Sequence, residues 1–269
     1  MRPWNIAHRG GAQSRPENSL AAFGYAATCG YDGVELDVQL SRDGEVVVFH
    51  DYRLKPEICR DASGRWLAPP APRVKDLTLA ELKRIDIGRA DPASAYAREH
   101  PYVVWRDRER IPTLDEVVAT AKKVRAPFYL FVELKTSAAE PGLSAPPEEL
   151  AERVLAVLKA RDYLERAVFV GFDWRGLIHA KRIVPEVPCW FSTLTFAGLS
   201  VLHEIKAQGG DGWFPAFVYA TEEAVRAARG LGLKVGAWTV YDPAEMRRLI
   251  DLGLDAICTD RPDLLAALA

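Results

Sequence analysis

The chain has 269 residues, of which 49% are hydrophobic and 27% charged, which is enough apolar material for one large core. Its 35 basic and 37 acidic residues give a formal net charge of −2, so neither nucleic acid nor an anionic membrane surface is an expected partner. No segment approaches the ~20 apolar residues of a membrane-spanning helix, and no apolar signal segment precedes the first predicted strand, so we expect a cytoplasmic protein without stable membrane insertion.

The first predicted elements are a strand, a helix and a second strand. A short strand at residues 6–7 ends in a polar pair and two glycines, and a helical pattern covers residues 20–30. In residues 33–40 apolar side chains alternate with polar ones, which is the period of a strand. This order predicts a βαβ unit with parallel strands, so His8 and Glu35 are expected at the same ends of neighbouring strands.

A hairpin and a long irregular segment come next. Residues 41–44 contain an Asp-Gly pair typical of a turn, and the apolar run 46–49 then returns the chain so that His50 lies near the acids of the preceding strand. Residues 52–111 are rich in Pro, Arg and Asp and contain one short helical pattern at 78–84. A segment of this length between core elements is typical of a functional lid, a small insertion or a mobile loop.

The rest of the chain alternates between strands and helices. Thr113 is expected to cap a helix that runs to about Val124. The further predicted strands are 128–135, 167–172, 187–192, 212–215, 234–240 and 256–259, and the helices between them include 147–160, 174–183, 221–231 and 243–252. With the two opening strands the count is eight, which favours one TIM (β/α)8 barrel over residues 1–269, with 52–111 inserted after the second strand. An open doubly wound sheet of six strands is the alternative, although no Gly-x-Gly-x-x-Gly turn follows the first strand.

Three acidic residues are predicted to meet at the mouth of this barrel. Glu133 has the same strand parity as Glu35 and Asp37. Three carboxylates in a partly buried site would repel one another, and a hard divalent cation such as Mg²⁺ or Ca²⁺ would resolve that conflict. The alternative is an ordinary polar cluster in which the acids pair with Arg9, Lys135 and solvent.

Two histidines and two cations are expected beside the acids. His8 and His50 lie at predicted strand ends, and a histidine, with an ordinary pKa of ~6.5, can exchange a proton near neutral pH. Arg9 and Lys135 would reach the same opening and favour an anionic group, with Arg9 suited to a phosphate by its planar fork. Hydrogen-bonded core or metal-site histidines and a plain arginine–carboxylate salt bridge are the alternatives.

Aromatic residues gather at the predicted ends of other strands. They are Phe172, Trp190, Phe191, Trp213, Phe214 and Trp238. Most are expected to pack in the core or at its rim, and one or two to form the wall of a substrate pocket, Trp238 first.

With these residues in view, the chain resembles the glycerophosphodiester phosphodiesterase family. The motifs that carry the resemblance extend over essentially the whole chain, in order. They are His8-Arg9, Pro16-Glu17-Asn18-Ser19, Glu35-x-Asp37, His50-Asp51, Ile111-Pro112-Thr113-Leu114, Val132-Glu133-Leu134-Lys135, Ala237-Trp238-Thr239-Val240 and Thr259-Asp260-Arg261-Pro262-Asp263.

The resemblance implies a TIM barrel and metal-dependent hydrolysis of a glycerophosphodiester to sn-glycerol 3-phosphate and an alcohol. It implies that residues 52–111 are the family's insertion. Carried over residue by residue, it makes His8 and His50 the general acid and base, Arg9 and Lys135 the cations on the phosphate side, and Glu35, Asp37 and Glu133 the ligands of one divalent cation, Mg²⁺ or Ca²⁺. Phe172 and Trp238 are then expected to contact the substrate.

Two residues depart from the family pattern. Tyr241 stands where the family often has Asn, and Gly171 precedes Phe172 where Ser is common. The nucleophile is either water or the glycerol 2-hydroxyl, which would give a cyclic phosphate first. Other functions that fit the same residues are a non-hydrolytic phosphodiester-binding barrel, a lysophospholipase D and a phosphoinositide-specific phospholipase.

Overall fold

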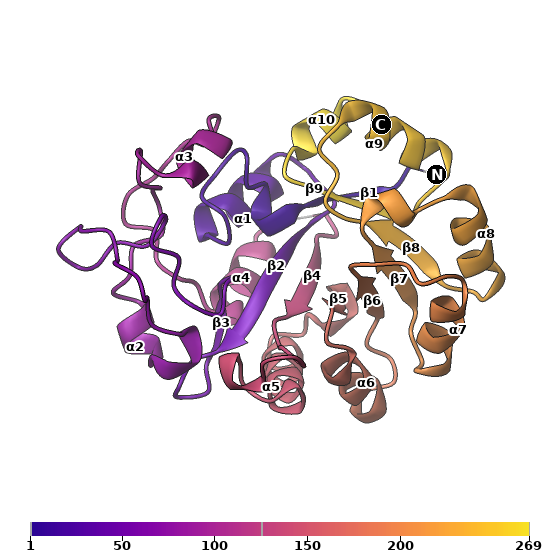
Figure 1. Cartoon of the computed structure of the whole chain (residues 1–269), viewed down its shortest axis with the longest axis horizontal. Helices are drawn as coiled ribbons and strands as arrows, with labels where there is room; N and C mark the ends of the chain where they lie inside the picture. Colours follow the sequence, from indigo (N-terminus) through magenta and orange to yellow (C-terminus); the bar gives the residue numbers. More distant parts are fainter. Residues whose placement is uncertain (1, 125, 269) are drawn as a thin grey trace.

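Eight parallel strands close into a barrel in the part of the chain described by the computed structural model, residues 2–124 and 126–268 (Figure 1). In barrel order they are β1 (Trp4–Ala7), β2 (Gly33–Leu40), β4 (Tyr129–Leu134), β5 (Ala167–Gly171), β6 (Cys189–Thr193), β7 (Gly212–Pro215), β8 (Lys234–Ala237) and β9 (Ala256–Thr259). The barrel is closed because Ile6 of β1 lies opposite Cys258 of β9 on one side and Gly33 of β2 on the other. The predicted TIM barrel is confirmed, and the open six-stranded sheet is wrong.

One further strand lies outside the barrel. β3 (Val46–Val48) runs antiparallel to β2, with Val38 opposite Val48, so the predicted hairpin is confirmed. The strand predicted to run to residue 240 ends earlier, at Ala237, because only an isolated bridge from Trp238 to Ala216 continues the pairing there.

Helices follow the barrel strands, as the sequence pattern predicts. They are α1 (Leu20–Thr28), α4 (Leu114–Ala121), α5 (Pro147–Ala160), α6 (Trp174–Ile183), α7 (Ser200–Ala207), α8 (Glu222–Gly230), α9 (Pro243–Asp251) and α10 (Pro262–Ala266), with short 3-10 turns η1 (His8–Gly10), η3 (Pro141–Leu143), η4 (Leu164–Arg166) and η5 (Phe217–Tyr219). Thr113 caps α4 in a capping box with Glu116, as predicted, although the helix ends at Ala121. The helix α7 fits the predicted alternation of strand and helix, but its range is not among those given from the sequence; it begins at Ser200, and its N-cap Leu199 makes no side-chain hydrogen bond.

Apolar side chains fill both sides of the barrel wall. Leu130 and Val132 of β4 belong to the core between the strands and the helices, whereas Phe131 packs inside the barrel. The Phe131 ring meets the Trp190 ring edge to face at 5.2 Å, and Trp4 stacks over Trp190 at 6.3 Å near the N-terminal ends of the strands. Because aromatic rings occupy that end, the polar residues of the barrel interior collect at the C-terminal end, the mouth.

Residues 52–111, which we call the lobe, form a packed unit beside the barrel, on the left in Figure 1. The lobe contains η2 (Val74–Asp76), α2 (Leu79–Leu82) and α3 (Ala95–Glu99), and α2 confirms the predicted short helix. Its buried core includes Leu54, Ile58, Leu82, Ile87 and Tyr96 and packs on Val47 of β3. The division of the chain into one domain with the lobe as its insertion stays a prediction.

In the two described ranges, no helix combines the length and the apolar character needed to cross a membrane.

Candidate active site

The turn after β1 places His8 and Arg9 at the mouth of the barrel. In this turn, η1, Arg9 has a left-handed φ of 49°. Gly10 follows with a φ of 84°, and a Cβ atom there would lie 2.6 Å from the Cβ of Ala22 in α1, so glycine allows the turn to pack on the helix. The Arg9 backbone N–H then donates to Oε2 of Glu35 at 3.1 Å, which ties the turn to β2.

Glu35, Asp37 and Glu133 lie together on β2 and β4. Asp37 is in register with Glu133, and Glu35 lies two residues upstream on the same face of β2. One ligand oxygen from each carboxylate lies within 4.8 Å of the others. Burial and the nearby charges of Asp37 and Glu133 raise the pKa of Glu35 well above its ordinary value, and its buried Oε1 has no hydrogen-bond partner among the described residues. A hard divalent cation would supply the missing partner and remove the repulsion, so the three acids fit such an ion.

Arg9 and Lys135 partly neutralise these acids. Nε of Arg9 lies 3.4 Å from Asp37, and Nζ of Lys135 lies 3.7 Å from Asp37 and 2.8 Å from Glu133. Burial alone would raise the pKa of Asp37, but the charges of His50, Arg9 and Lys135 hold it well below its ordinary value. The predicted acidic cluster and the alternative set of ion pairs are therefore both present.

His8 and His50 each form a hydrogen bond with an aspartate through Nδ1. The distance is 2.6 Å from His8 to Asp260 and 2.5 Å from His50 to Asp51, and Nε2 of His8 lies 3.8 Å from Glu35. Burial works against ionisation of both aspartates, but their histidine partners hold the pKa of each below its ordinary value. An ionised carboxylate only accepts hydrogen bonds, so we assign the proton to Nδ1 in both rings. Nε2 of each ring is then the atom that can exchange a proton with a bound molecule.

One cavity of about 260 Å³ joins most of the predicted site residues. Those that line it are His8, Arg9, Glu35, His50, Glu133, Phe172 and Trp238. The other two, Asp37 and Lys135, contact the lining residues Arg9 and Glu133. The rings of Phe172 and Trp238 meet edge to face at 5.1 Å, and Trp238 Nε1 donates to the carbonyl of Phe214 at 2.9 Å. The cavity therefore has charged groups together with an aromatic wall.

Of the other aromatic residues considered, Phe214 also lines the cavity, Trp190 packs inside the barrel, and Phe191 and Trp213 pack in the outer core. Tyr241, which departs from the family pattern, lines the cavity as well.

Sequence reasoning assigned no role to several residues that hold the site together. Arg9 pairs with the buried Glu17 at 3.1 Å, and the hydroxyl of Tyr96 in the lobe donates to the same carboxylate. Burial would raise the pKa of Glu17, but Arg9 and Tyr96 hold it below its ordinary value. Asn18 Nδ2 donates to Asp37 at 2.8 Å. The Pro16-Glu17-Asn18 motif could have indicated from the sequence that Glu17 and Asn18 belong to the site. No local pattern indicates that Tyr96, 79 residues from Glu17, is the partner of that carboxylate.

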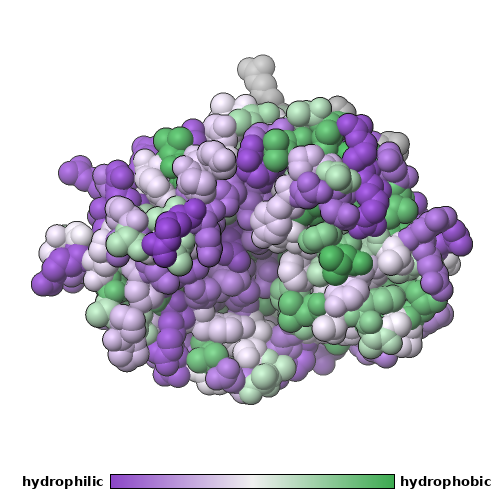
Figure 2. All heavy atoms as spheres, turned by 45° about the horizontal axis from the view of Figure 1, so that its top comes forward, coloured by the Kyte–Doolittle hydropathy of each residue, from purple (hydrophilic) through white to green (hydrophobic). Residues whose placement is uncertain are grey.

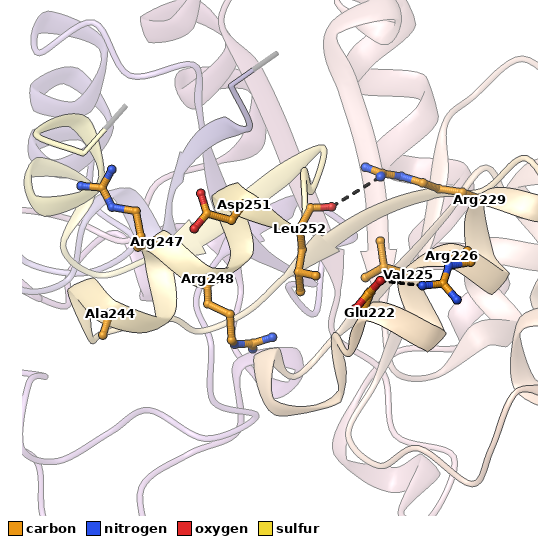
Figure 3. Close-up of a pocket in the computed structure, with 9 residues that line it drawn as sticks. All are labelled: Glu222, Val225, Arg226, Arg229, Ala244, Arg247, Arg248, Asp251 and Leu252. Atoms are coloured by element: carbon orange, nitrogen blue, oxygen red, sulfur yellow. Dashed lines mark hydrogen bonds and ion pairs between the residues drawn. The ribbon is translucent and has the colours of Figure 1, made fainter.

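A larger hollow of about 790 Å³ lies between α8 and α9 (Figure 3). Its arginines are largely engaged by protein groups: Arg226 pairs with Glu222 at 2.5 Å, Arg229 donates to backbone carbonyls, and Arg248 donates to the carbonyl of Ala220 at 2.8 Å. None of the predicted site residues lines this hollow, so the cavity at the barrel mouth is the better candidate site.

Comparisons with known proteins find similarity over nearly the whole chain. The model of the Glycerophosphoryl diester phosphodiesterase family matches residues 8–264. A glycerophosphodiester phosphodiesterase of Caldanaerobacter subterraneus is 31% identical over 98% of this chain and 97% of its own. A Silicibacter pomeroyi protein whose crystal structure carries the family's name superposes with a TM-score of 0.91 and 30% identity over 99% of this chain and 93% of its own. An Oleispira antarctica phosphodiesterase, solved in complex with the product sn-glycerol-3-phosphate, gives a TM-score of 0.80 and 27% identity over 99% of this chain and 96% of its own.

Proposed function

The chain belongs to the glycerophosphoryl diester phosphodiesterase family, and from this membership we propose that it hydrolyses glycerophosphodiesters to sn-glycerol 3-phosphate and an alcohol with one divalent cation. The observation that carries the proposal is that one cavity is lined by two carboxylates of the three-acid cluster and by two histidines, each paired with an aspartate. The product bound to the Oleispira antarctica relative supports the same product here. A cytoplasmic location stays a prediction.

Glu35, Asp37 and Glu133 would hold the cation, Mg²⁺ or Ca²⁺, through oxygen ligands. Bound there, it would neutralise the charge that gathers on the phosphoryl oxygens during hydrolysis. The unpartnered Oε1 of Glu35 supports this role, since a buried carboxylate oxygen without a partner is costly to the folded protein.

Arg9 and Lys135 would bind the phosphate from the protein side. Burial opposes the charge of both, but the surrounding acids raise the pKa of each above its ordinary value, so both stay cationic. The planar fork of Arg9 suits two phosphate oxygens. Phe172 and Trp238 would contact the carbon skeleton of the substrate through the aromatic wall.

His8 and His50 would move the two protons of the reaction. One imidazole takes the proton of the nucleophile at Nε2, and the other gives a proton to the leaving alcohol. Asp260 and Asp51 keep each ring oriented and stabilise it when it is charged. Both nucleophiles, water and the glycerol 2-hydroxyl, are compatible with this arrangement.

The test is the release of glycerol 3-phosphate from a panel of glycerophosphodiesters by the purified protein, after EDTA treatment and after Mg²⁺ or Ca²⁺ is restored. We expect release that depends on the metal. A folded, metal-loaded protein that binds a glycerophosphodiester but leaves it uncleaved would identify a binding barrel instead and overturn the proposal.

Histidine variants test the acid–base roles separately from metal binding. His8→Ala and His50→Ala should each lower kcat by about 10²- to 10⁴-fold while calorimetry shows the metal still bound. His203→Ala is the matched control, because this histidine is exposed on α7, outside the cavity. Unchanged turnover in either of the first two variants removes that residue from the mechanism.

A further inference from the structure

Lys55 is a half-buried cation of the lobe that lies beside the candidate active site. It follows His50 by five residues, and its Nζ lies over the ring of Tyr96, 4.5 Å from the centroid. Within residues 2–124 and 126–268, its ammonium group forms neither an ion pair nor a hydrogen bond. By contrast, Arg9 and Lys135, the other two cations of the site, both pair with acids. Lys55 therefore keeps its N–H donors for a bound molecule or for water.

The backbone and the side chain of Lys55 are both held in place. Its carbonyl accepts a hydrogen bond from the N–H of the buried Cys59 at 3.0 Å. The ring of Tyr96 beneath its ammonium group is fixed by the hydrogen bond to Glu17 and by the ring of His100, which stacks on it at 4.0 Å. A cation over the face of an aromatic ring is attracted by the π electrons of that ring. Lys55 therefore has little side-chain freedom left to lose on binding, which favours a role in recognition.

The charge of Lys55 reaches two acids that support the reaction. Burial would raise the pKa of Asp51 and of Glu17, and Lys55 is among the cations that hold both below their ordinary values. Asp51 is the hydrogen-bond partner of His50, and Glu17 is the ion-pair partner of Arg9. Because each of these acids has its own partner, Lys55 is available to an anion on this side of the mouth.

The lobe as a whole is basic, whereas the rest of the chain is acidic. In the lobe 13 residues are Lys or Arg and 9 are Asp or Glu, while the rest of the chain has 22 and 28. Figure 2 shows a hydrophilic hollow with hydrophobic residues gathered to its right, where Figure 1 places β7 and β8, and Figure 1 places the lobe on the left. The lobe therefore brings positive charge to the polar side of the mouth, which favours an anion there.

A phosphodiester has two arms, which leave the phosphorus atom in different directions. One arm, the glycerol, can pack its carbon skeleton on the aromatic wall of the cavity. With the phosphate at Arg9 and Lys135, the other arm then leaves past His50 toward the lobe. The side chain of His50 is 32% exposed, so this side of the cavity is open to solvent. The leaving alcohol would meet Lys55 there.

We propose that Lys55 determines specificity by binding an anionic group on the leaving alcohol, so that the preferred glycerophosphodiesters are those whose alcohol carries a carboxylate or a phosphate. This inference rests on the proposed hydrolase function. The anionic group accepts hydrogen bonds from the Lys55 ammonium, while the reacting phosphate stays at Arg9 and Lys135. An alcohol whose only charge is positive, such as choline or ethanolamine, is repelled by Lys55 instead.

The experiment uses two pairs of substrates whose members differ in one anionic group. Glycerophosphoserine is glycerophosphoethanolamine with an added carboxylate, and glycerophosphoglycerol is compared with its terminal phosphate ester. The anionic member of each pair should have a kcat/KM about ten-fold higher, which is the size expected for a hydrogen bond to a charged group. The preference should weaken as the salt concentration rises, because the interacting charges are partly exposed.

Three variants locate the effect at Lys55. Lys55→Gln should abolish the preference in both pairs, Lys55→Arg should keep it, and Lys55→Glu should reverse it. The quantity measured is the ratio of kcat/KM within a pair, which cancels any general loss of activity that reaches Arg9 through Tyr96. Arg65→Gln is the matched control and should keep the preference. It also removes one positive charge from the lobe, but the Arg65 side chain is 82% exposed and pairs with Asp61 in its own turn.

The outcomes separate this inference from the proposed function. Cleavage without a difference within either pair overturns the inference and leaves the hydrolase function intact. A preference that persists in Lys55→Gln also overturns it, because another group then binds the anion, and an equal loss in Arg65→Gln would assign the preference to the overall charge of the lobe. A preference in one pair alone supports the inference and identifies the anionic group that is bound. Failure to cleave any of the four substrates would remove the hydrolase function itself.

Discussion

The two halves of the barrel mouth are built from the same kind of element and differ in almost every chemical property. β1, the turn after it, β2 and β4 carry His8, Arg9, Glu35, Asp37 and Glu133, whereas β6, β7 and β8 lead into loops in which Asp242 is the one charged residue before the next helix. In a closed parallel barrel all strands end at the same face, so each half can change without disturbing the other. The charged half is suited to the reaction and the apolar half to recognition of the substrate.

The charged half requires more support from the rest of the protein. Buried charges are stable only when each has partners, and Arg9, Glu17 and Asp37 obtain theirs from β2, from the loop before α1 and from the lobe. The apolar half is held by packing, as between Phe196 and Tyr219, and by hydrogen bonds such as the one from Trp238 to the Phe214 carbonyl. Substitutions in the charged half should therefore have larger effects than substitutions in the apolar half.

The largest effect is expected at the proposed metal ligands. Glu133→Gln keeps the size of the side chain but removes a charged oxygen ligand, and we expect kcat to fall by about 10³-fold or more with weaker metal binding by calorimetry. Glu148→Gln, at an exposed acid in the first turn of α5, is the control. Full activity of Glu133→Gln at low metal concentration would contradict the assignment.

The next largest effect is expected at the aspartate that holds His8. Asp260→Asn keeps a partner for the ring but no longer fixes Nδ1 as the donor, so kcat should fall by about 10- to 100-fold with a smaller change in KM. Asp51→Asn should cost less, because the Asp51 side chain is 38% exposed and that of Asp260 only 8%. Equal losses in the two variants would contradict this order.

The same aspartate predicts a pH dependence of stability. The folded pKa of Asp260 lies below its ordinary value, and an unfolded aspartate has a pKa of ~3.9. Its contribution to the free energy of unfolding is therefore complete above the unfolded pKa and is lost as the pH falls toward the folded pKa. The difference in Tm between wild type and Asp260→Asn should be constant near neutral pH and shrink below about pH 4. A difference that grows on acidification would show that the pKa is shifted the other way.

A smaller effect is expected where the lobe meets the charged half. Tyr96→Phe removes the hydrogen bond to Glu17 and should lower the free energy of unfolding by about 1–3 kcal/mol. Because Glu17 positions Arg9, KM should also rise more than kcat falls. Tyr102→Phe, at a residue 70% exposed, is the matched control. A stability loss with unchanged KM would limit Tyr96 to a structural role.

The smallest effect is expected in the aromatic wall of the apolar half. Trp238→Phe loses the hydrogen bond to the Phe214 carbonyl and part of the contact with Phe172, which should raise KM by about two- to ten-fold and leave kcat nearly unchanged. Trp66→Phe in the lobe is the control, since that ring packs beside Arg60, outside the cavity. A large fall in kcat would show that Trp238 takes part in the chemical step and not only in substrate binding.

Much of the fold and of the charged half could be predicted from the sequence. The alternation of apolar and polar residues in 33–40 and in 128–135 determines which side chains face the barrel interior, and His8, Glu35 and Glu133 converge because parallel strands end together. The start of α7 has no local mark in the sequence, because Leu199 at its N-cap has no side-chain cap and no proline follows, whereas Pro147 marks the start of α5.

Only the tertiary structure decided which distant residues complete the site. Asp260 reaches His8 across 252 residues because β9 closes the barrel against β1, and Tyr96 reaches Glu17 because the lobe folds back on the loop before α1. The loops after β6, β7 and β8, which hold one charged residue, Asp242, are visible in the sequence, but their adjacency follows from the pairing of β6, β7 and β8. Local patterns determine which way a side chain points, because backbone geometry is local, whereas long-range pairing is set by the barrel closure that buries the whole core.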